Sequence, residues 1–68
     1  MDAETLRRRM LALGLTYYTL GTEAGVAHTT IWRWLRGTHP PSKVFAAHVD
    51  AVLCRLEQAQ QDAQENAS

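Results

Sequence analysis

The feature that most restricts the fold of this chain is a register of glycine and apolar residues in the segment 17–37, YYTLGTEAGVAHTTIWRWLRG. Gly25 follows Gly21 by four residues, and Ile31 and Trp34 follow Gly25 by six and nine residues. A glycine inside a helix costs about 1 kcal/mol relative to alanine, so Gly21 is tolerated most readily where a second helix crosses too closely for a side chain. Gly25 makes the tight turn, and the two apolar residues hold the second helix on the first. The register therefore predicts two short helices joined by a tight turn.

Helical spacing predicts one further helix on each side of this pair. Leu6, Met10 and Leu13 repeat at helical intervals. Gly14 then suits a C-terminal cap, and Thr16 suits the N-terminal cap of the next helix. No segment alternates as a strand does, so we expect an all-α, compact four-helix domain. The expected helices run from about Ala3 to Leu13, from about Tyr17 to Ala24, from Ala27 or His28 to Leu35 or Arg36, and onward from Ser42 or Lys43.

The third expected helix has two chemically different faces. With about 100° per residue, its apolar side chains share one face, and its hydrogen-bonding and cationic side chains share the opposite face. The apolar face comprises Ala27, Ile31, Trp34 and Leu35, and the opposite face comprises Thr29, Arg33 and Arg36, with Trp32 on the flank and His28 at the start.

Charge is distributed unevenly along a chain whose formal net charge is zero. Between Arg7 and Lys43 there are six basic residues and one acidic residue, Glu23, a local net charge of +5. The remaining acidic residues lie near the two ends. A basic middle with acidic ends is compatible with one face that meets phosphates.

The stretch GVAHTTIWRWLRG, residues 25–37, resembles the second half of the Cro/repressor-type helix-turn-helix motif. The resemblance covers about Leu6 to Gly37 and extends to small phage transcriptional regulators, among them repressors associated with anti-CRISPR operons. Two positions depart from the family pattern. Gly21 stands where alanine is usual, and Ala27 stands where a serine or threonine usually caps the recognition helix.

The resemblance implies a sequence-specific regulator of transcription, a repressor, whose third helix enters the major groove of double-stranded DNA. The residues that it places at base edges are His28, Thr29, Trp32, Arg33 and Arg36. The expected phosphate contacts are Tyr17, Thr19, Thr30, Lys43, Arg8 and Arg9. Arg33 is the main candidate for base readout, because arginine can donate two parallel hydrogen bonds to guanine O6 and N7.

The last expected helix carries a wide apolar stripe, which suits it to dimerisation. We expect its first half to pack on the domain and its second half to meet a partner copy. The expected interface residues are Val49, Val52, Leu53 and Leu56. The DNA-binding domain then spans residues 1–57, and residues 58–68 form a polar tail that frays. A homodimer would bind an inverted repeat, with its recognition helices about 34 Å apart.

Composition argues against several other classes of protein. One cysteine, Cys54, allows no internal disulfide, and three scattered histidines do not suggest a structural zinc site. The apolar run from Leu11 to Leu15 is too short for a membrane span, and no secretory signal pattern is present. We therefore expect a cytoplasmic protein, in a bacterium or a phage-infected cell, with no cofactor and no evident small-molecule ligand.

Three other functions remain open at this point. The chain could be an antitoxin that holds a toxin through its last helix, or an excisionase-like architectural factor, both of which bind DNA. It could also be a protein–protein adaptor that binds no DNA, which the neutral net charge keeps open. An enzyme is not expected, because no paired carboxylates, Cys/His arrangement or phosphate-binding glycine loop occurs at a workable spacing.

Overall fold

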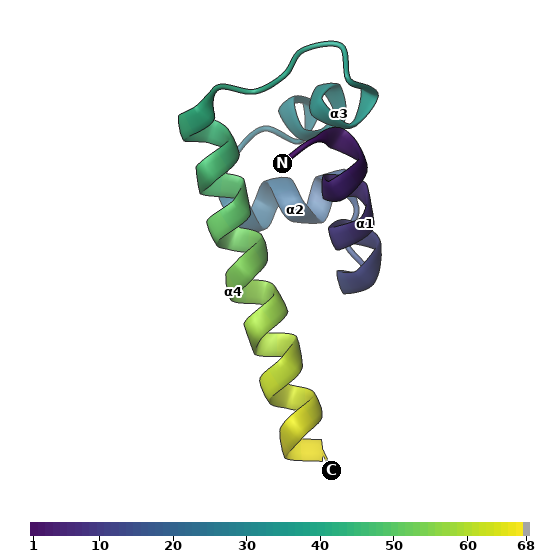
Figure 1. The fold of residues 1–68 in the computed structure, drawn as a ribbon, viewed down its shortest axis with the longest axis vertical. Coiled ribbons are helices and arrows are strands. Elements are labelled where there is room, and N and C mark those ends of the chain that lie inside the picture. The colour runs from purple at the N-terminus through teal and green to yellow at the C-terminus, as the bar shows by residue number, and fades with distance from the viewer. Residues whose placement is uncertain (68) are drawn as a thin grey trace.

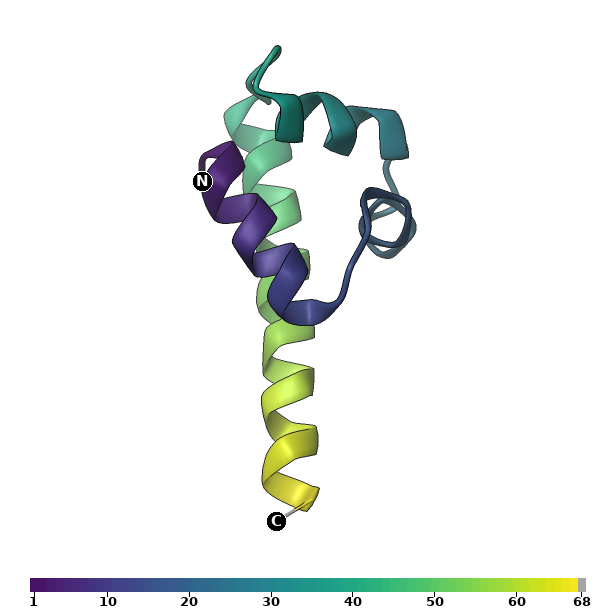
Figure 2. The ribbon, with the colours of Figure 1, turned by 90° about the vertical axis from the view of Figure 1, so that its right-hand side faces the viewer.

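The computed structural model describes residues 1–67, with side chains through residue 66, and these form four helices and no strand. The helices are α1 (Ala3–Leu13), α2 (Tyr17–Ala24), α3 (His28–Arg36) and α4 (Lys43–Ala67). The predicted all-α, four-helix fold is confirmed. The first three helices and the first half of α4 form a compact body, from which the rest of α4 extends (Figure 1). Figure 2 shows this extension from the side. The described chain measures 42 × 19 × 19 Å.

The end of α1 and the start of α2 lie where caps were predicted, and α2 ends at the glycine predicted to make the tight turn. Thr16 begins α2 with a capping box, in which its hydroxyl accepts from the Thr19 N–H at 3.2 Å and its own N–H donates to the Thr19 hydroxyl at 2.8 Å. Gly14 and Gly25 end α1 and α2 with left-handed backbone, at φ values of 68° and 70°. A side chain is strained in this conformation, so glycine is the residue that stops each helix there.

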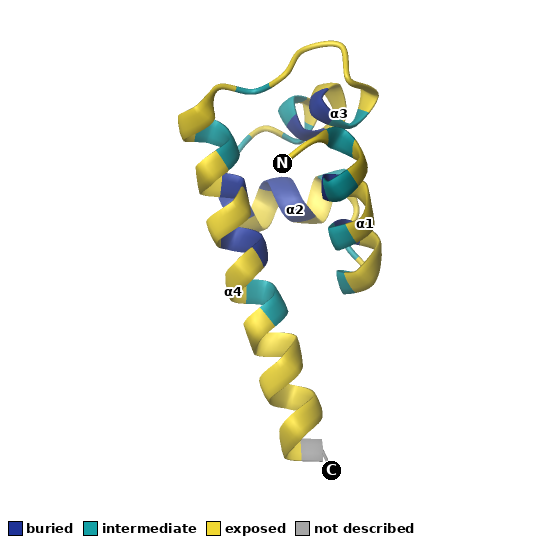
Figure 3. Cartoon of the chain, viewed as in Figure 1, coloured by how far each residue is buried: buried dark blue, intermediate teal, exposed yellow. Residues whose placement is uncertain are grey.

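One apolar core joins all four helices (Figure 3). Its fully buried side chains are Leu6, Leu20, Ile31, Val49 and Leu53. Ala27, which the sequence assigned to an apolar face, lies outside this core and is exposed at the N-cap of α3. Val44 is 82% exposed in the first turn of α4. No helix in the described part of the chain has the length and apolar character that spanning a membrane requires.

Polar contacts attach α4 to α2. The Nε2 atom of His48 lies 2.7 Å from the carbonyl oxygen of Ala24, the last residue of α2, so the imidazole donates to a helix-end carbonyl. Arg55 and Glu23 form a longer, exposed ion pair at 3.7 Å. Because α2 ends at this point, α4 holds the C-terminal end of the helix that precedes the tight turn.

The apolar stripe of α4 is used mainly inside the chain. Val49 and Leu53 have no exposed surface, and Val52 is 7% exposed. Of the four residues expected at a dimer interface, only Leu56 keeps appreciable exposed surface. The three buried valine and leucine side chains therefore offer a partner copy almost no contact area in this arrangement, and dimerisation stays a prediction.

Beyond Glu57, α4 projects from the body as a polar helix. Residues 58–66 are all exposed, and the helix continues through Ala67, while residue 68 of the expected tail lies outside the described part of the chain. An isolated polar helix of this length is marginally stable in water, because tertiary packing supplies most helix stability in proteins. That the tail frays stays a prediction.

Candidate nucleic-acid interface

The crossing of α2 and α3 depends on the missing side chain of Gly21. A Cβ atom at this buried position would lie 3.0 Å from the carbonyl oxygen of Val26 and 3.1 Å from the Cα atom of His28. These neighbours are backbone atoms of the turn and of the first residue of α3, so they move only if the turn moves. The Val26 N–H also donates to the Gly21 carbonyl at 2.9 Å. The sequence-based explanation of Gly21, close approach of a second helix, is therefore confirmed.

The exposed face of α3 carries polar and cationic side chains. Thr29, Arg33 and Arg36 are exposed, whereas Ile31 and Trp34 are buried on the opposite face. The two faces of this helix are thus divided as predicted, except that Ala27, which was assigned to the apolar face, is the exposed N-cap residue. Within residues 1–66, neither arginine of α3 forms an ion pair with a carboxylate. Their guanidinium groups are consequently available to an anionic or hydrogen-bonding partner.

Trp32 lies next to the cationic side chains on this face. It is 42% exposed, and the guanidinium carbon of Arg36 lies 4.7 Å from its ring centroid. Such cation–π contacts contribute about 0.5–1 kcal/mol at exposed sites. Trp32 therefore directs Arg36 along the outside of α3, and this gives the tryptophan a role on the surface rather than in the core.

Three aromatic rings meet where the N-terminal ends of α2 and α3 approach each other. The imidazole of His28 stacks on the ring of Tyr18, with centroids 4.1 Å apart and planes at 21°. Tyr18 stacks in turn on Tyr17 at 5.0 Å. His28 and Tyr17 were expected to contact DNA, whereas Tyr18 was missed. Helical spacing places Tyr18 near the start of α2, but only the crossing angle of the two helices brings it to His28.

The other expected phosphate contacts differ in how accessible they are. Arg8 and Lys43 are exposed, and Thr30 is partly buried. Thr19 is exposed, but its hydroxyl donates to the Thr16 carbonyl at 3.0 Å and accepts from the Thr16 N–H. The only proton of that hydroxyl is therefore already used in the helix cap. A phosphate contact by Thr19 would have to break this bond.

Arg9 makes a different contact from the one expected of it. Its guanidinium donates to the Asp50 carboxylate at 2.6 Å and to both Glu57 oxygens at 2.7 and 2.8 Å. The Sγ atom of Cys54 lies 3.4 Å away. The side chain is only 20% exposed. Because these donors are engaged by two carboxylates on α4, Arg9 joins α1 to α4 and is not free to bind phosphate in this arrangement.

This cluster leads to a prediction about acid stability. The hydrogen bond from Arg9 lowers the pKa of Glu57 below its ordinary value of 4.5. A lowered folded-state pKa stabilises the fold above the unfolded value, and this contribution is lost as the pH falls through the folded value. Glu57→Gln should therefore reduce the loss of stability measured by urea unfolding between about pH 5 and pH 3. We expect this loss in the free energy of unfolding to be smaller in Glu57→Gln than in wild type by at most about 1 kcal/mol, because Glu57 is partly solvated.

Asp62→Asn is the matched control for Glu57→Gln. Asp62 lies on the projecting part of α4, where it accepts from the Gln58 side chain at 3.0 Å. Its removal should leave the acid dependence unchanged. Some dependence will remain in both variants, because hydrogen bonds from Thr5 lower the pKa of Asp2 as well. Equal acid profiles for wild type and Glu57→Gln would contradict the assignment.

A second arginine of α1, Arg7, supports the end of α3. One of its guanidinium nitrogens donates to the carbonyl oxygen of Leu35 at 2.8 Å, and another lies 3.5 Å from the Glu4 carboxylate. The last carbonyls of a helix have no partner within the helix, and a cation there also opposes the negative end of the helix dipole. Arg7 thus helps to position α3, although no local pattern in the sequence links residues 7 and 35.

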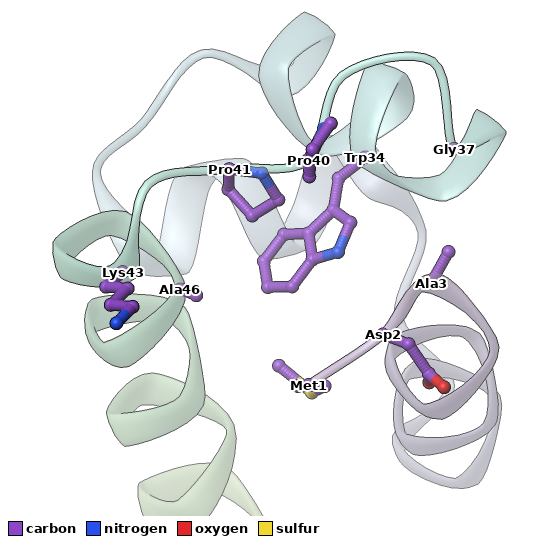
Figure 4. A pocket seen from close by; sticks show the side chains of 9 residues that line it. All are labelled: Met1, Asp2, Ala3, Trp34, Gly37, Pro40, Pro41, Lys43 and Ala46. Carbon is purple, nitrogen blue, oxygen red and sulfur yellow. The ribbon is translucent and has the colours of Figure 1, made fainter.

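A hollow of about 410 Å³ lies between the end of α3, the following loop and the N-terminal ends of α1 and α4 (Figure 4). The indole of Trp34 lines this hollow, together with Pro40, Pro41 and Met1, which lie around it in Figure 4. Trp34 belongs to the buried face of α3. The hollow is therefore separate from the exposed face that carries Arg33. No group of three metal-ligating side chains occurs in the part of the chain that the structure describes.

A family model described as a helix-turn-helix domain matches residues 3–64 of the chain. The match includes all of α1, α2 and α3 and most of α4. No curated protein and no solved structure matches the chain.

Proposed function

We propose that this chain, which belongs to the helix-turn-helix domain family, is a sequence-specific transcriptional regulator that inserts α3 into the major groove of double-stranded DNA. The observation that carries the proposal is the exposed face of α3. It presents Thr29, Arg33 and Arg36 to solvent, without a carboxylate partner in residues 1–66 for either arginine. The opposite face is buried, so α3 can be inserted without exposing the core.

The proposed roles follow from what each side chain can donate. Arg33 reads a guanine through two parallel hydrogen bonds, and Thr29 contacts a base edge or a thymine methyl group. Arg36, held beside Trp32, binds either a base or a phosphate. Arg8 and Lys43 supply general attraction to the DNA backbone, which fixes affinity but carries no sequence information.

We further propose that the active form is a homodimer that binds an inverted repeat and represses a promoter by occupying it, as in Cro/repressor-type phage regulators. A single nine-residue recognition helix offers few base contacts. Two helices about 34 Å apart on one face of DNA double the number of base pairs that are read. A candidate contact surface is Leu56 with the exposed face of α4 around it.

Selection from a random pool of double-stranded DNA tests this function. The wild-type chain is incubated with the pool at low salt, and the retained molecules are sequenced. We expect enrichment of an inverted repeat with half-sites about one helical turn apart. Affinity for the recovered site should fall steeply as salt rises, because phosphate contacts release counterions.

The other outcomes test the dimer, the architectural factor and the adaptor. Enrichment of a single half-site would support DNA reading and contradict the dimer. Retention without any enriched sequence would indicate an architectural factor. No retention even at low salt would refute DNA binding and leave a protein–protein adaptor as the better hypothesis.

A further inference from the structure

The stacked rings of Tyr18 and His28 suggest a function for a tyrosine that no pattern in the sequence singled out. We propose that Tyr18 is a positioning residue, which holds the imidazole of His28 at the start of α3 in the orientation that reads DNA. The inference rests on the proposed function, because it concerns the same interface. It adds a specificity-determining contact between α2 and α3.

The geometry of the stack supports this role. The two ring centroids lie 4.1 Å apart with nearly parallel planes, so Tyr18 covers one face of the imidazole. The ring centroid of Tyr17 lies beside the pair, 5.0 Å from that of Tyr18 and 5.9 Å from that of His28, so Tyr17 limits the movement of both rings. Stacking on Tyr18 covers a face of the imidazole and not its edge, where the ring nitrogens lie. Within residues 1–66 neither nitrogen of the partly buried His28 forms a hydrogen bond, so the imidazole retains its donor and its acceptor for a base or a phosphate.

The exposure of Tyr18 indicates that this residue contributes little to the hydrophobic core. Its side chain is 57% exposed, and it is not among the residues that form or flank the hydrophobic cluster. Large aromatic side chains usually gain stability by burial. Here the ring is kept on the surface next to the recognition helix, where its main described contacts are the two neighbouring rings.

Without the stack, the partly buried His28 side chain would sample more rotamers at the start of α3. The cap of this helix cannot restrain it, because Ala27 has no side chain that hydrogen-bonds the first turn. An unrestrained side chain loses more conformational entropy when it binds, which weakens its contact. Tyr18 therefore acts on the base contact through His28 and needs no contact of its own with the base.

The test compares base preference in four variants at the site recovered by selection. His28→Ala identifies the base pair that His28 reads. Tyr18→Ala should relax preference at that same base pair by about two- to tenfold. Tyr18→Phe keeps the ring and should retain the wild-type preference. In the double variant, the loss should be no larger than in His28→Ala alone, because the two side chains act as one unit.

Two results would overturn the inference while leaving the proposed function intact. One is an additive loss in the double variant. The other is a uniform loss of affinity in Tyr18→Ala with base preference unchanged. If the wild type binds no DNA, the proposed function itself is refuted. Far-UV circular dichroism of each variant shows that it is folded, and the ring protons of His28 should shift in the NMR spectrum of Tyr18→Ala but not of Tyr18→Phe.

Discussion

Replacing Arg33 with alanine is expected to relax base recognition at one position of the binding site by about 1–3 kcal/mol. The side chain is exposed on the outward face of α3, and it has no carboxylate partner in residues 1–66. A guanidinium in this situation can donate two hydrogen bonds to guanine in the major groove. Competition binding between the recovered site and sites changed at single base pairs measures the effect.

Arg55→Ala is the charge-matched control for Arg33→Ala. Arg55 lies on α4, where it forms a long, exposed ion pair with Glu23 at 3.7 Å. Removing it changes the net charge by the same amount, so any general electrostatic loss should be similar in the two variants. We expect Arg55→Ala to keep the full base preference. If both variants lose affinity alike and neither changes the preferred sequence, Arg33 binds phosphate and does not read a base.

The ends of the first three helices could be predicted because the signals that determine them are local. Gly14 and Gly25 adopt the left-handed backbone that stops a helix, and Thr16 caps the next helix through its own hydroxyl. Each signal involves residues within about one turn of the helix end. The two faces of α3 were predictable for a similar reason, because the period of a helix is fixed.

Contacts between distant segments could not be predicted in this way. Arg9 was expected to contact phosphate, yet it binds Asp50 and Glu57. No periodicity links residues 9 and 57. The same limit applies to Tyr18, whose partner His28 is ten positions away and across a turn.

The apolar stripe of α4 shows a further limit of prediction from helical periodicity. Period alone shows that Val49, Leu53 and Leu56 share one side of a helix. It does not say whether that side covers the chain's own core or a second copy. In the structure Val49 and Leu53 are fully buried by α4 packing on α1 and α2, and Leu56 lies at the edge of this contact. Whether the stripe covers the chain's own core or a second copy depends on how much apolar surface the other three helices leave uncovered.

Trp34→Ala is expected to cost the largest amount of stability of any substitution considered, about 3–5 kcal/mol. The indole is 3% exposed, and its ring centroid lies 6.2 Å from that of Phe45 on α4. Removing it leaves a cavity beside the existing hollow and breaks contact between α3 and α4. A domain of this length has a total stability of only about 3–10 kcal/mol. The variant should therefore be largely unfolded, or close to it.

Trp32→Ala provides the control, because it removes the same side chain two residues earlier on the same helix. Trp32 is 42% exposed, and its one described ring contact is with Arg36. We expect this change to lower the free energy of unfolding by less than about 1 kcal/mol. Urea unfolding followed by far-UV circular dichroism compares the two variants without relying on tryptophan fluorescence. Trp34→Phe keeps part of the buried ring, so it should unfold between wild type and Trp34→Ala. Similar losses in Trp32→Ala and Trp34→Ala would mean that α3 does not bury the face described here, and the exposed face assigned to DNA would then have to be reassigned.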